Sequence, residues 1–161
     1  MDRANQAPRA AGRKTLRVDA RALVETCAGW NSRLAARRIT QFFDRELAET
    51  GLAVTQLGLM AQIATAADDT LGALARSTGL EQSTLSRNLR TLEGLGLIEI
   101  AVVETDLRRR AVWLTEAGAR RLEAAVPLWR KAHAKLDKLL TPGLARRLAE
   151  ETEVLADRDA G

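Results

Sequence analysis

The chain has 161 residues, 46% hydrophobic and 29% charged, which suits one domain or one domain with added dimerisation helices. Its formal net charge of +4 comes from residues 1–21, which hold six of the 25 basic and two of the 21 acidic residues. The rest of the chain has nineteen basic and nineteen acidic residues, so bulk charge does not indicate DNA binding. There is no apolar run of about 18 residues and no secretory signal, and the one cysteine cannot form an intrachain disulfide, so we expect a cytoplasmic protein without a membrane span.

Residues 1–20 are predicted to form a disordered basic arm. They contain Pro8, Gly12 and scattered arginines, but no sustained apolar period. Such an arm is either a passive terminus or a segment that reaches along phosphates or into a minor groove. The sequence leaves both interpretations open.

Residues 21–54 are predicted to belong to a helical dimerisation region. A single long helix is expected from Arg21 to Thr50, with Gly51 as its stop, and it would be too long for a small core to bury. Thr55 is expected to cap the next helix. The apolar positions of the long helix are Leu23, Cys27, Trp30, Leu34, Ile39, Phe42, Phe43 and Leu47.

The stretch from residue 70 to residue 94 predicts two helices joined by a tight turn. Thr70 can cap a short helix, Gly79 can turn the chain with a positive φ, and Leu80 re-enters the core. In the second helix Leu85, Leu89 and Leu92 form one apolar stripe. The opposite face and its flanks carry hydroxyl, amide and guanidinium groups, from Gln82, Ser83, Thr84, Ser86, Arg87 and Arg90. Such a face is typical of a helix that enters the major groove of DNA.

A β-hairpin is predicted after this helix. Residues 97–103 and 110–114 are rich in β-branched and apolar side chains, and they flank a polar tip from Glu104 to Arg109. Residues 55–115 are therefore predicted to be a winged helix-turn-helix that binds DNA. The local basic cluster lies at the wing, in Arg108, Arg109 and Arg110.

Residues 116–158 are predicted to complete the dimerisation region. Thr115 can cap a long helix that contains Pro127, and Thr141 with Pro142 is expected to open the last helix. A heptad-like seam runs along the long helix through Leu122, Val126, Trp129, His133, Leu136 and Leu140. The expected fold class is mainly α, with a small β-hairpin wing and long N- and C-terminal helices that form a homodimer.

From about Cys27 to Leu155 the order and spacing of motifs resemble the MarR family of bacterial transcription regulators. The most specific motif is Asp106-x-Arg108 followed by Leu114-Thr115-x-x-Gly118. The other matching pieces are Arg45-Glu46-Leu47, Gly51-Leu52, Thr55-Gln56, Leu74-Ala75, Gly79-Leu80, Ser83-Thr84-Leu85-Ser86-Arg87, Leu92-Glu93 and Gly96-Leu97-Ile98.

The resemblance implies a homodimer that binds palindromic operators on double-stranded DNA and usually represses. It implies base and phosphate contacts from Ser83, Thr84, Ser86, Arg87 and Arg90. It also implies that Arg108 reaches the minor groove, positioned by Asp106, with added charge from Arg109 and Arg110. The chain departs from the family pattern where Ile100 and Ala101 replace basic residues that often follow the start of the wing, so phosphate contacts there are in doubt.

Regulators of this type usually release DNA in response to a ligand or an oxidant. Cys27 is a redox candidate near the start of a long helix, and its alternative is a small buried hydrophobe. A pocket for a small aromatic acid is the second candidate, and its residues could equally be core or dimer-interface residues. That pocket would comprise Trp30, Arg33, Arg37, Trp129 and His133.

An enzyme is disfavoured because the chain has one histidine, one cysteine and no tyrosine. It also has no phosphate-binding glycine loop and no metal-ligand spacing, so we expect no catalytic residues, metal or cofactor. A winged-helix module that binds only proteins is the alternative to DNA binding, and it predicts no steep dependence of affinity on salt.

Overall fold

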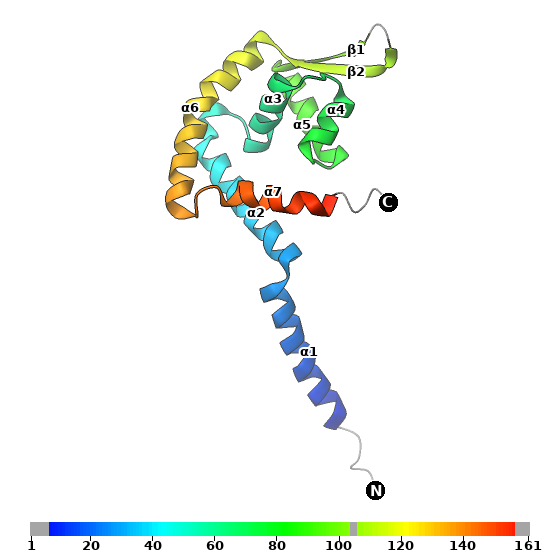
Figure 1. Cartoon of the computed structure of the whole chain (residues 1–161), viewed down its shortest axis with the longest axis vertical. Helices are drawn as coiled ribbons and strands as arrows, with labels where there is room; N and C mark the ends of the chain where they lie inside the picture. Colours follow the sequence, from blue (N-terminus) through cyan, green and yellow to red (C-terminus); the bar gives the residue numbers. More distant parts are fainter. Residues whose placement is uncertain (1–6, 104–105, 157–161) are drawn as a thin grey trace. The chain divides into compact units, whose positions relative to one another are not determined.

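The computed structural model describes the backbone of residues 7–103 and 106–156 and the side chains of residues 15–102 and 110–155. The chain divides into two compact units, residues 1–42 and 43–161. In the described part, the elements are helices together with one two-stranded antiparallel hairpin (Figure 1), which confirms the predicted fold class.

The first unit consists of α1 (Ala7–Thr26) and most of α2 (Ala28–Glu46). The prediction of a disordered arm over residues 1–20 is therefore wrong from Ala7 onward. The segment is rich in Ala, Leu and Arg, which are strong helix formers. Pro8 falls in the first turn, where a backbone N–H has no partner within the helix, so proline does not interrupt the hydrogen bonds.

The predicted single helix from Arg21 to Thr50 is interrupted at Cys27, between α1 and α2. The side-chain amide of Asn31 donates to the carbonyl oxygens of Glu25 (3.2 Å) and Cys27 (3.0 Å). A side chain that inserts among backbone hydrogen bonds is a common cause of a helix break. The break therefore has a local chemical cause in the Asn31 amide.

The second unit begins with the last turn of α2, a short 3-10 helix η1 (Ala48–Thr50) and α3 (Val54–Thr65). Gly51 ends η1 with φ 69°, as predicted. The N-cap of α3 is Ala53 rather than the predicted Thr55. Alanine can serve here because the Gln56 side chain accepts from Ala53 N (3.0 Å) and an Asp44 carboxylate oxygen accepts from Val54 N (2.8 Å).

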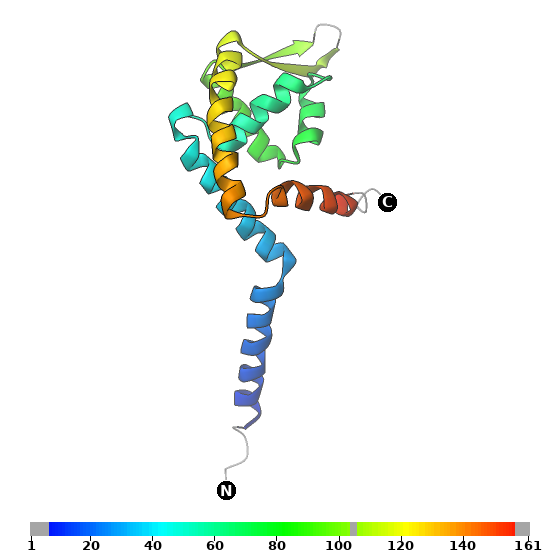
Figure 2. The same cartoon turned by 60° about the vertical axis from the view of Figure 1, so that its left-hand side comes forward.

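Helix α3 is the centre of the second unit. It contacts α4 (Leu71–Thr78), α5 (Gln82–Gly94), β2 (Asp106–Leu114) and α6 (Glu116–Leu139). Figures 1 and 2 show α3, α4 and α5 on one side of the hairpin. The largest fully buried side chains of the core come from α3, from α5 and from the residues before η1 and after α5, namely Leu47, Leu59, Met60, Leu92 and Ile98.

The hairpin pairs β1 (Ile98–Val103) with β2, with Ile98 opposite Leu114 and Glu99 opposite Trp113. The register is irregular between Val102 and Val103. Strand β2 starts at Asp106, four residues earlier than predicted, so Asp106 to Arg109 belong to the strand backbone and not to the tip. Residues 104 and 105 of the predicted tip lie outside the described residues.

Helix α6 continues through Pro127, and its N-cap is Thr115, as predicted. Gly118, Ala125 and Ala132 are buried at a spacing of seven residues. Residues of the predicted heptad seam lie beside this row and are less buried: Val126 is half-buried and Trp129 is exposed.

Helix α7 spans Leu144–Ala156, and the prediction that Thr141 and Pro142 open it is wrong. These residues form a turn closed by a hydrogen bond from Leu144 N to Thr141 O (3.1 Å). Gly143 has φ 72°, a left-handed conformation that cannot lie inside a right-handed helix, so the helix starts after it.

Candidate nucleic-acid interface

The helix-turn-helix is formed by α4 and α5. The Thr70 hydroxyl accepts from Ala73 N (3.3 Å) and caps α4, and Gly79 turns the chain with φ 60°. Both features were predicted. Leu80 is half-buried, so it returns to the edge of the core rather than to its centre.

Helix α5 presents the predicted polar face. Leu85, Leu89 and Leu92 are buried. On the other side Gln82, Ser83, Arg87 and Arg90 are exposed, and Thr84 and Ser86 on the flanks are half-buried. One side of α5 is therefore fixed to the core by leucines, while its hydroxyl and guanidinium groups remain free to reach a ligand.

The wing is attached to the helix-turn-helix at its base. Val112 N donates to Asp69 O (2.8 Å), and Thr70 forms an isolated β-bridge with Ala111. The residue that caps α4 is thus also paired with the wing. These backbone bonds place β2 next to the turn that precedes α4. The wing is therefore attached directly to the helix-turn-helix.

A groove of about 580 Å³ lies between α4, α5 and the hairpin. It brings together four residues predicted to contact DNA, namely Gln82, Ser86, Arg90 and Arg110. One carboxylate, Glu93, also lines it. Guanidinium groups from two separate elements at the edge of one groove are suited to bind phosphate oxygens or base edges.

The base of the wing differs from its basic end. Ile100 lines the groove, and the exposed indole N–H of Trp113 donates to a carboxylate oxygen of Glu99 (3.1 Å). An isoleucine and a carboxylate give no attraction for phosphate. The doubt about phosphate contacts at the base, which the sequence raised from Ile100 and Ala101, stays a prediction. The side chains of Asp106, Arg108 and Arg109 lie outside the described residues.

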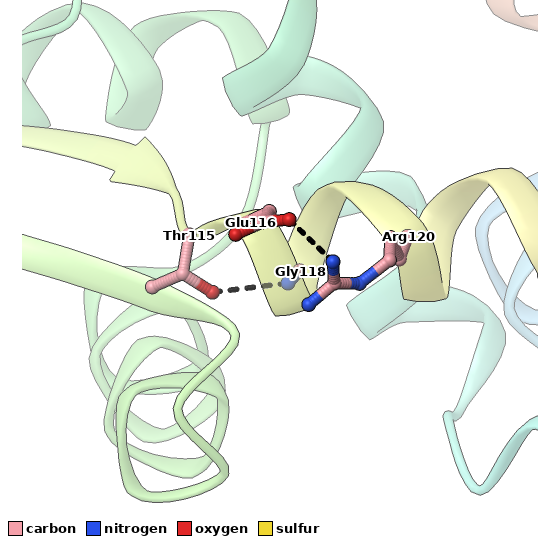
Figure 3. A network of polar contacts seen from close by, with 4 residues as sticks. All are labelled: Thr115, Glu116, Gly118 and Arg120. Atoms are coloured by element: carbon pink, nitrogen blue, oxygen red, sulfur yellow. Dashed lines mark hydrogen bonds and ion pairs between the residues drawn. The ribbon is translucent and has the colours of Figure 1, made fainter.

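The base of the wing is joined to α6 at Thr115, and Figure 3 shows two polar contacts there, between Thr115 and Gly118 and between Glu116 and Arg120. The Thr115 hydroxyl donates to Gly96 O (2.7 Å) and accepts from Gly118 N (3.0 Å), and Thr115 N donates to Leu97 O (3.1 Å). A Cβ at Gly118 would lie 1.9 Å from Leu97 O, so only glycine fits at this position. Glu116 and Arg120 form an exposed ion pair on the first turns of α6.

The candidate sensor residues fall into two groups. Trp129 and His133 on α6 meet edge to face with ring centroids 4.5 Å apart, and the His133 ring is 4.8 Å from that of Phe43. Trp30, Arg33 and Arg37 lie on α2 in the first unit and are exposed. A single pocket formed by both groups stays a prediction. Cys27 is a half-buried free thiol at the break between α1 and α2.

A second groove, not found from the sequence, lies between α3 and α6. Its volume is about 430 Å³, and Trp129 is the predicted sensor residue that lines it. Its other lining residues are Val54, Leu57, Gly58, Ala61, Gln62, Thr65, Leu122 and Val126. Sequence periodicity placed these residues on two amphipathic helices, but only the crossing of α3 and α6 shows that small residues such as Gly58 and Ala61 leave a gap.

No helix in the described ranges is long and apolar enough to cross a membrane. Among the same residues, no group of three or more His, Cys, Asp or Glu side chains is arranged to hold a metal ion.

A reading helix with a buried leucine stripe, a hairpin attached to its base and arginines on both define a winged helix-turn-helix protein that binds double-stranded DNA and regulates transcription. Comparison with known proteins places it more closely. A model described as the MarR family matches residues 50–109. None of the curated proteins matches the chain.

Solved structures resemble the chain over most of its length. The transcriptional regulator MosR of M. tuberculosis in complex with DNA is 33% identical, with a TM-score of 0.72 over 81% of this chain and 97% of that one. MosR in a second crystal structure is 30% identical, with a TM-score of 0.69 over 86% and 99%. The repressor CouR bound to a 23-mer DNA duplex is 21% identical, with a TM-score of 0.70 over 83% and 95%, and shares the fold. The chain belongs to the MarR family of transcription regulators.

Proposed function

We propose that the protein is a homodimeric repressor that binds an inverted-repeat operator and releases it in response to a small molecule. The observation that carries this proposal is the groove between α5 and the wing, where Arg90 and Arg110 from two elements flank Gln82 and Ser86. A repressor must reach chromosomal DNA, so we propose a cytoplasmic location. We propose no catalytic role.

In this proposal α5 enters the major groove. Its exposed residues Gln82, Ser83 and Arg87 meet base edges, and Arg90 contacts the phosphate backbone. The wing approaches the neighbouring minor groove, where Arg108 is positioned by Asp106 and Arg109 adds charge. Arg110 lies between the major-groove contact of α5 and the minor-groove contact of the wing, because it is exposed and lines the groove shared with α5.

Fluorescence anisotropy with an operator selected from genomic fragments tests this proposal. Arg87→Ala or Arg108→Ala should raise the operator Kd by about thirtyfold or more, since the dimer loses two contacts and one good contact to DNA contributes about 1–3 kcal/mol. Arg90→Ala should lower the slope of log Kd against log salt by about two, because it removes one phosphate contact per protomer. Arg130→Ala is the matched control, because Arg130 is an exposed arginine on α6 beyond the interface.

The result that would overturn DNA binding by this face is equal affinity for wild type, Arg87→Ala and Arg130→Ala at every salt concentration. A bound site without inverted symmetry would overturn the two-fold arrangement. Half-sites read by two copies should be separated by about one helical turn or a multiple of it.

The C-terminal helices support the homodimer. Every side chain of α7 from Leu144 to Leu155 is exposed, although Leu144, Leu148 and Leu155 repeat on one face. In the heptad seam, Trp129 on α6 and Leu140, which caps the end of α6, are each 40% exposed. Apolar side chains at this spacing are buried when two helical surfaces associate, so these helices provide a self-complementary interface.

The groove between α3 and α6 is proposed as the effector site. It has the volume of a site for a small aromatic molecule, and Trp129 offers a stacking surface. None of its lining residues is ionisable, and its polar groups are Gln62 and Thr65. The favoured ligand is therefore an uncharged aromatic compound with one hydrogen-bonding group. An aromatic acid would require the predicted cations Arg33 or Arg37.

A pair of probes that differ in charge tests the ligand class. We expect 1-naphthamide to raise the melting temperature and to weaken operator binding, and 1-naphthoate to do so much less. Ala61→Trp should remove the response to the amide by filling the groove, while operator affinity without ligand stays unchanged. A stronger response to the carboxylate would instead support a site that includes Arg33 or Arg37.

A further inference from the structure

Glu93 places a negative charge in the groove between α5 and the wing. The ionisable residues that line this groove are Arg90, Glu93 and Arg110, and the other lining residues are neutral. All three charged side chains are exposed. Glu93 follows Arg90 by three positions on α5, so the two side chains lie on the same side of that helix. A carboxylate therefore stands beside the guanidinium groups that are proposed to contact DNA.

The Glu93 carboxylate has no partner of opposite charge among the described residues. The ion pairs found in the described ranges lie elsewhere, within α6, within α7 and between α6 and the end of α2. Neither Arg90 nor Arg110 takes part in any of them. The carboxylate and the two guanidinium groups are thus all free to act on a molecule that enters the groove.

Helix α5 gains no stability from a carboxylate at position 93. Glu93 lies in the last turn of α5, where Gly96 N donates to its backbone oxygen (2.9 Å). The C-terminal end of a helix carries partial negative charge, so an acidic side chain there is unfavourable. A cation that precedes an acid along a helix is also the less favourable order of the two charges. The role of the Glu93 carboxylate therefore lies in what the groove binds.

We infer that Glu93 is a specificity-determining residue, which repels DNA phosphates and weakens binding to unrelated sequences more than binding to the operator. This inference rests on the proposed contact between the groove and DNA. Contacts to phosphate supply nearly all of the affinity for unrelated DNA, because they carry no sequence information. Unpaired charges that oppose the wrong partner are a general means of obtaining specificity.

The difference between the two complexes comes from the neighbouring guanidinium group. At the operator, the base contacts of Gln82 and Arg87 fix the position of α5, and with it that of Arg90, against the phosphate backbone. A guanidinium has five N–H donors, so Arg90 can donate to a phosphate and to Glu93 together, and its charge offsets the repulsion. On unrelated DNA no base contact fixes the position of α5. The arrangement is then only partly formed, and the repulsion between carboxylate and phosphate remains.

Direct reading of a base by Glu93 is the weaker interpretation. A carboxylate can accept from the amino group of cytosine. In a helix-turn-helix, however, base edges are contacted by residues near the N-terminus of the second helix. Gln82 is the first residue of α5, and Glu93 follows eleven positions later, about 16 Å along the helix axis. Glu93 therefore lies at the end of α5 that is suited to the phosphate backbone.

Fluorescence anisotropy with two duplexes of equal length, the operator and a scrambled sequence, tests the inference at low salt. Glu93→Gln keeps the size of the side chain and removes its charge. We expect the Kd for the scrambled duplex to fall by roughly tenfold, because each of the two copies in a dimer loses a repulsion between unit charges. The Kd for the operator should fall by about threefold or less, so the ratio of the two Kd values should fall several-fold.

Glu123→Gln is the matched control. Glu123 is an exposed glutamate on α6 that does not line the groove. Its substitution changes the net charge of the chain by the same amount, so it measures the effect of overall charge alone. We expect both Kd values to stay within about twofold of wild type. In urea unfolding Glu93→Gln should be at least as stable as wild type, because it removes an acid from the end of a helix.

An Arg90→Ala background tests the part played by the guanidinium. Without Arg90 the repulsion at the operator is no longer offset by that charge, so Glu93→Gln should strengthen operator binding by a larger factor than it does in wild type. An equal gain on the operator and on the scrambled duplex in the wild-type background would show that Glu93 acts on every phosphate alike. That result would overturn the inferred role in specificity.

The outcomes separate this inference from the proposed function. If Arg87→Ala weakens operator binding and Glu93→Gln changes neither Kd, the inference is wrong and the contact of α5 with DNA stands. If Glu93→Gln weakens operator binding and leaves the scrambled duplex unchanged, Glu93 reads a base and the inference is also wrong. If neither Arg87→Ala nor Arg90→Ala changes the operator Kd, the groove is not the DNA interface and both proposals fail.

Discussion

Replacing Gly118 by alanine should destabilise the protein, although alanine normally stabilises a helix. In an open helical position Gly→Ala adds about 1 kcal/mol to the free energy of unfolding. At position 118 the new Cβ would lie 1.9 Å from the carbonyl oxygen of Leu97, whereas a carbon and an oxygen normally approach no closer than about 3.3 Å. The start of α6 must therefore move away from the base of the wing by roughly 1 Å or more.

That movement has a definite set of bonds to break. The hydrogen bonds of Thr115 to Gly96 O and Leu97 O, and the cap from Gly118 N, all hold the same joint. Overpacking typically costs about 1–3 kcal/mol, and losing a helix cap costs about 1 kcal/mol. After subtracting the alanine gain, we expect the free energy of unfolding to fall by roughly 2 kcal/mol, and Tm to fall by about 4–8 °C for a chain of this size.

Gly58→Ala is the matched control. Gly58 also lies inside a helix, but a Cβ there meets nothing within 4 Å, so this variant should be more stable than wild type by about 0.5–1 kcal/mol. Urea unfolding followed by circular dichroism at one fixed protein concentration measures both variants, because dimer stability depends on concentration. If Gly118→Ala is as stable as Gly58→Ala, the close contact between α6 and the wing does not exist in solution.

Three further substitutions test other parts of the second unit and the thiol. Thr70→Ala removes the cap of α4 and should cost about 1 kcal/mol in urea unfolding, and an unchanged stability would show that the Ala73 N–H does not depend on this hydroxyl. Asp44→Ala removes the acceptor for Val54 N at the start of α3 and should cost a similar amount, about 1 kcal/mol, whereas Asp44→Asn should retain most of it. Cys27→Ser should leave operator affinity unchanged with and without peroxide, and a peroxide response in wild type that the variant lacks would instead make this thiol the sensor.

The sequence predicted the DNA-reading part of the fold because its signals are local. Thr70 and Thr115 are helix caps, Gly79 and Gly51 adopt positive φ, and the leucines of α5 share one stripe, so each feature depends on residues within a few positions. The same reasoning placed six DNA-contact candidates on the free side of α5. Their grouping with Arg110 required the bond from Val112 to Asp69, which joins residues far apart in the sequence.

The predicted helix boundaries were wrong where a distant or unusual hydrogen-bond partner replaces the usual local one. Helix α3 starts after Ala53 because Asp44, ten residues before Val54, accepts from Val54 N in place of a capping side chain. The break at Cys27 depends on the Asn31 amide, which an apolar periodicity does not register. The groove between α3 and α6 depends on how the two helices cross, and no pattern within either helix encodes that crossing.

The connection between the wing and α6 is a single residue, Thr115, and both its hydroxyl and its backbone N–H are held in hydrogen bonds. A link this short has no slack. Any rotation of α6 is therefore transmitted directly to the wing. An insertion of even one residue at this position should uncouple the wing from events along α6, whereas the turn at residues 141–143 can lengthen without that effect.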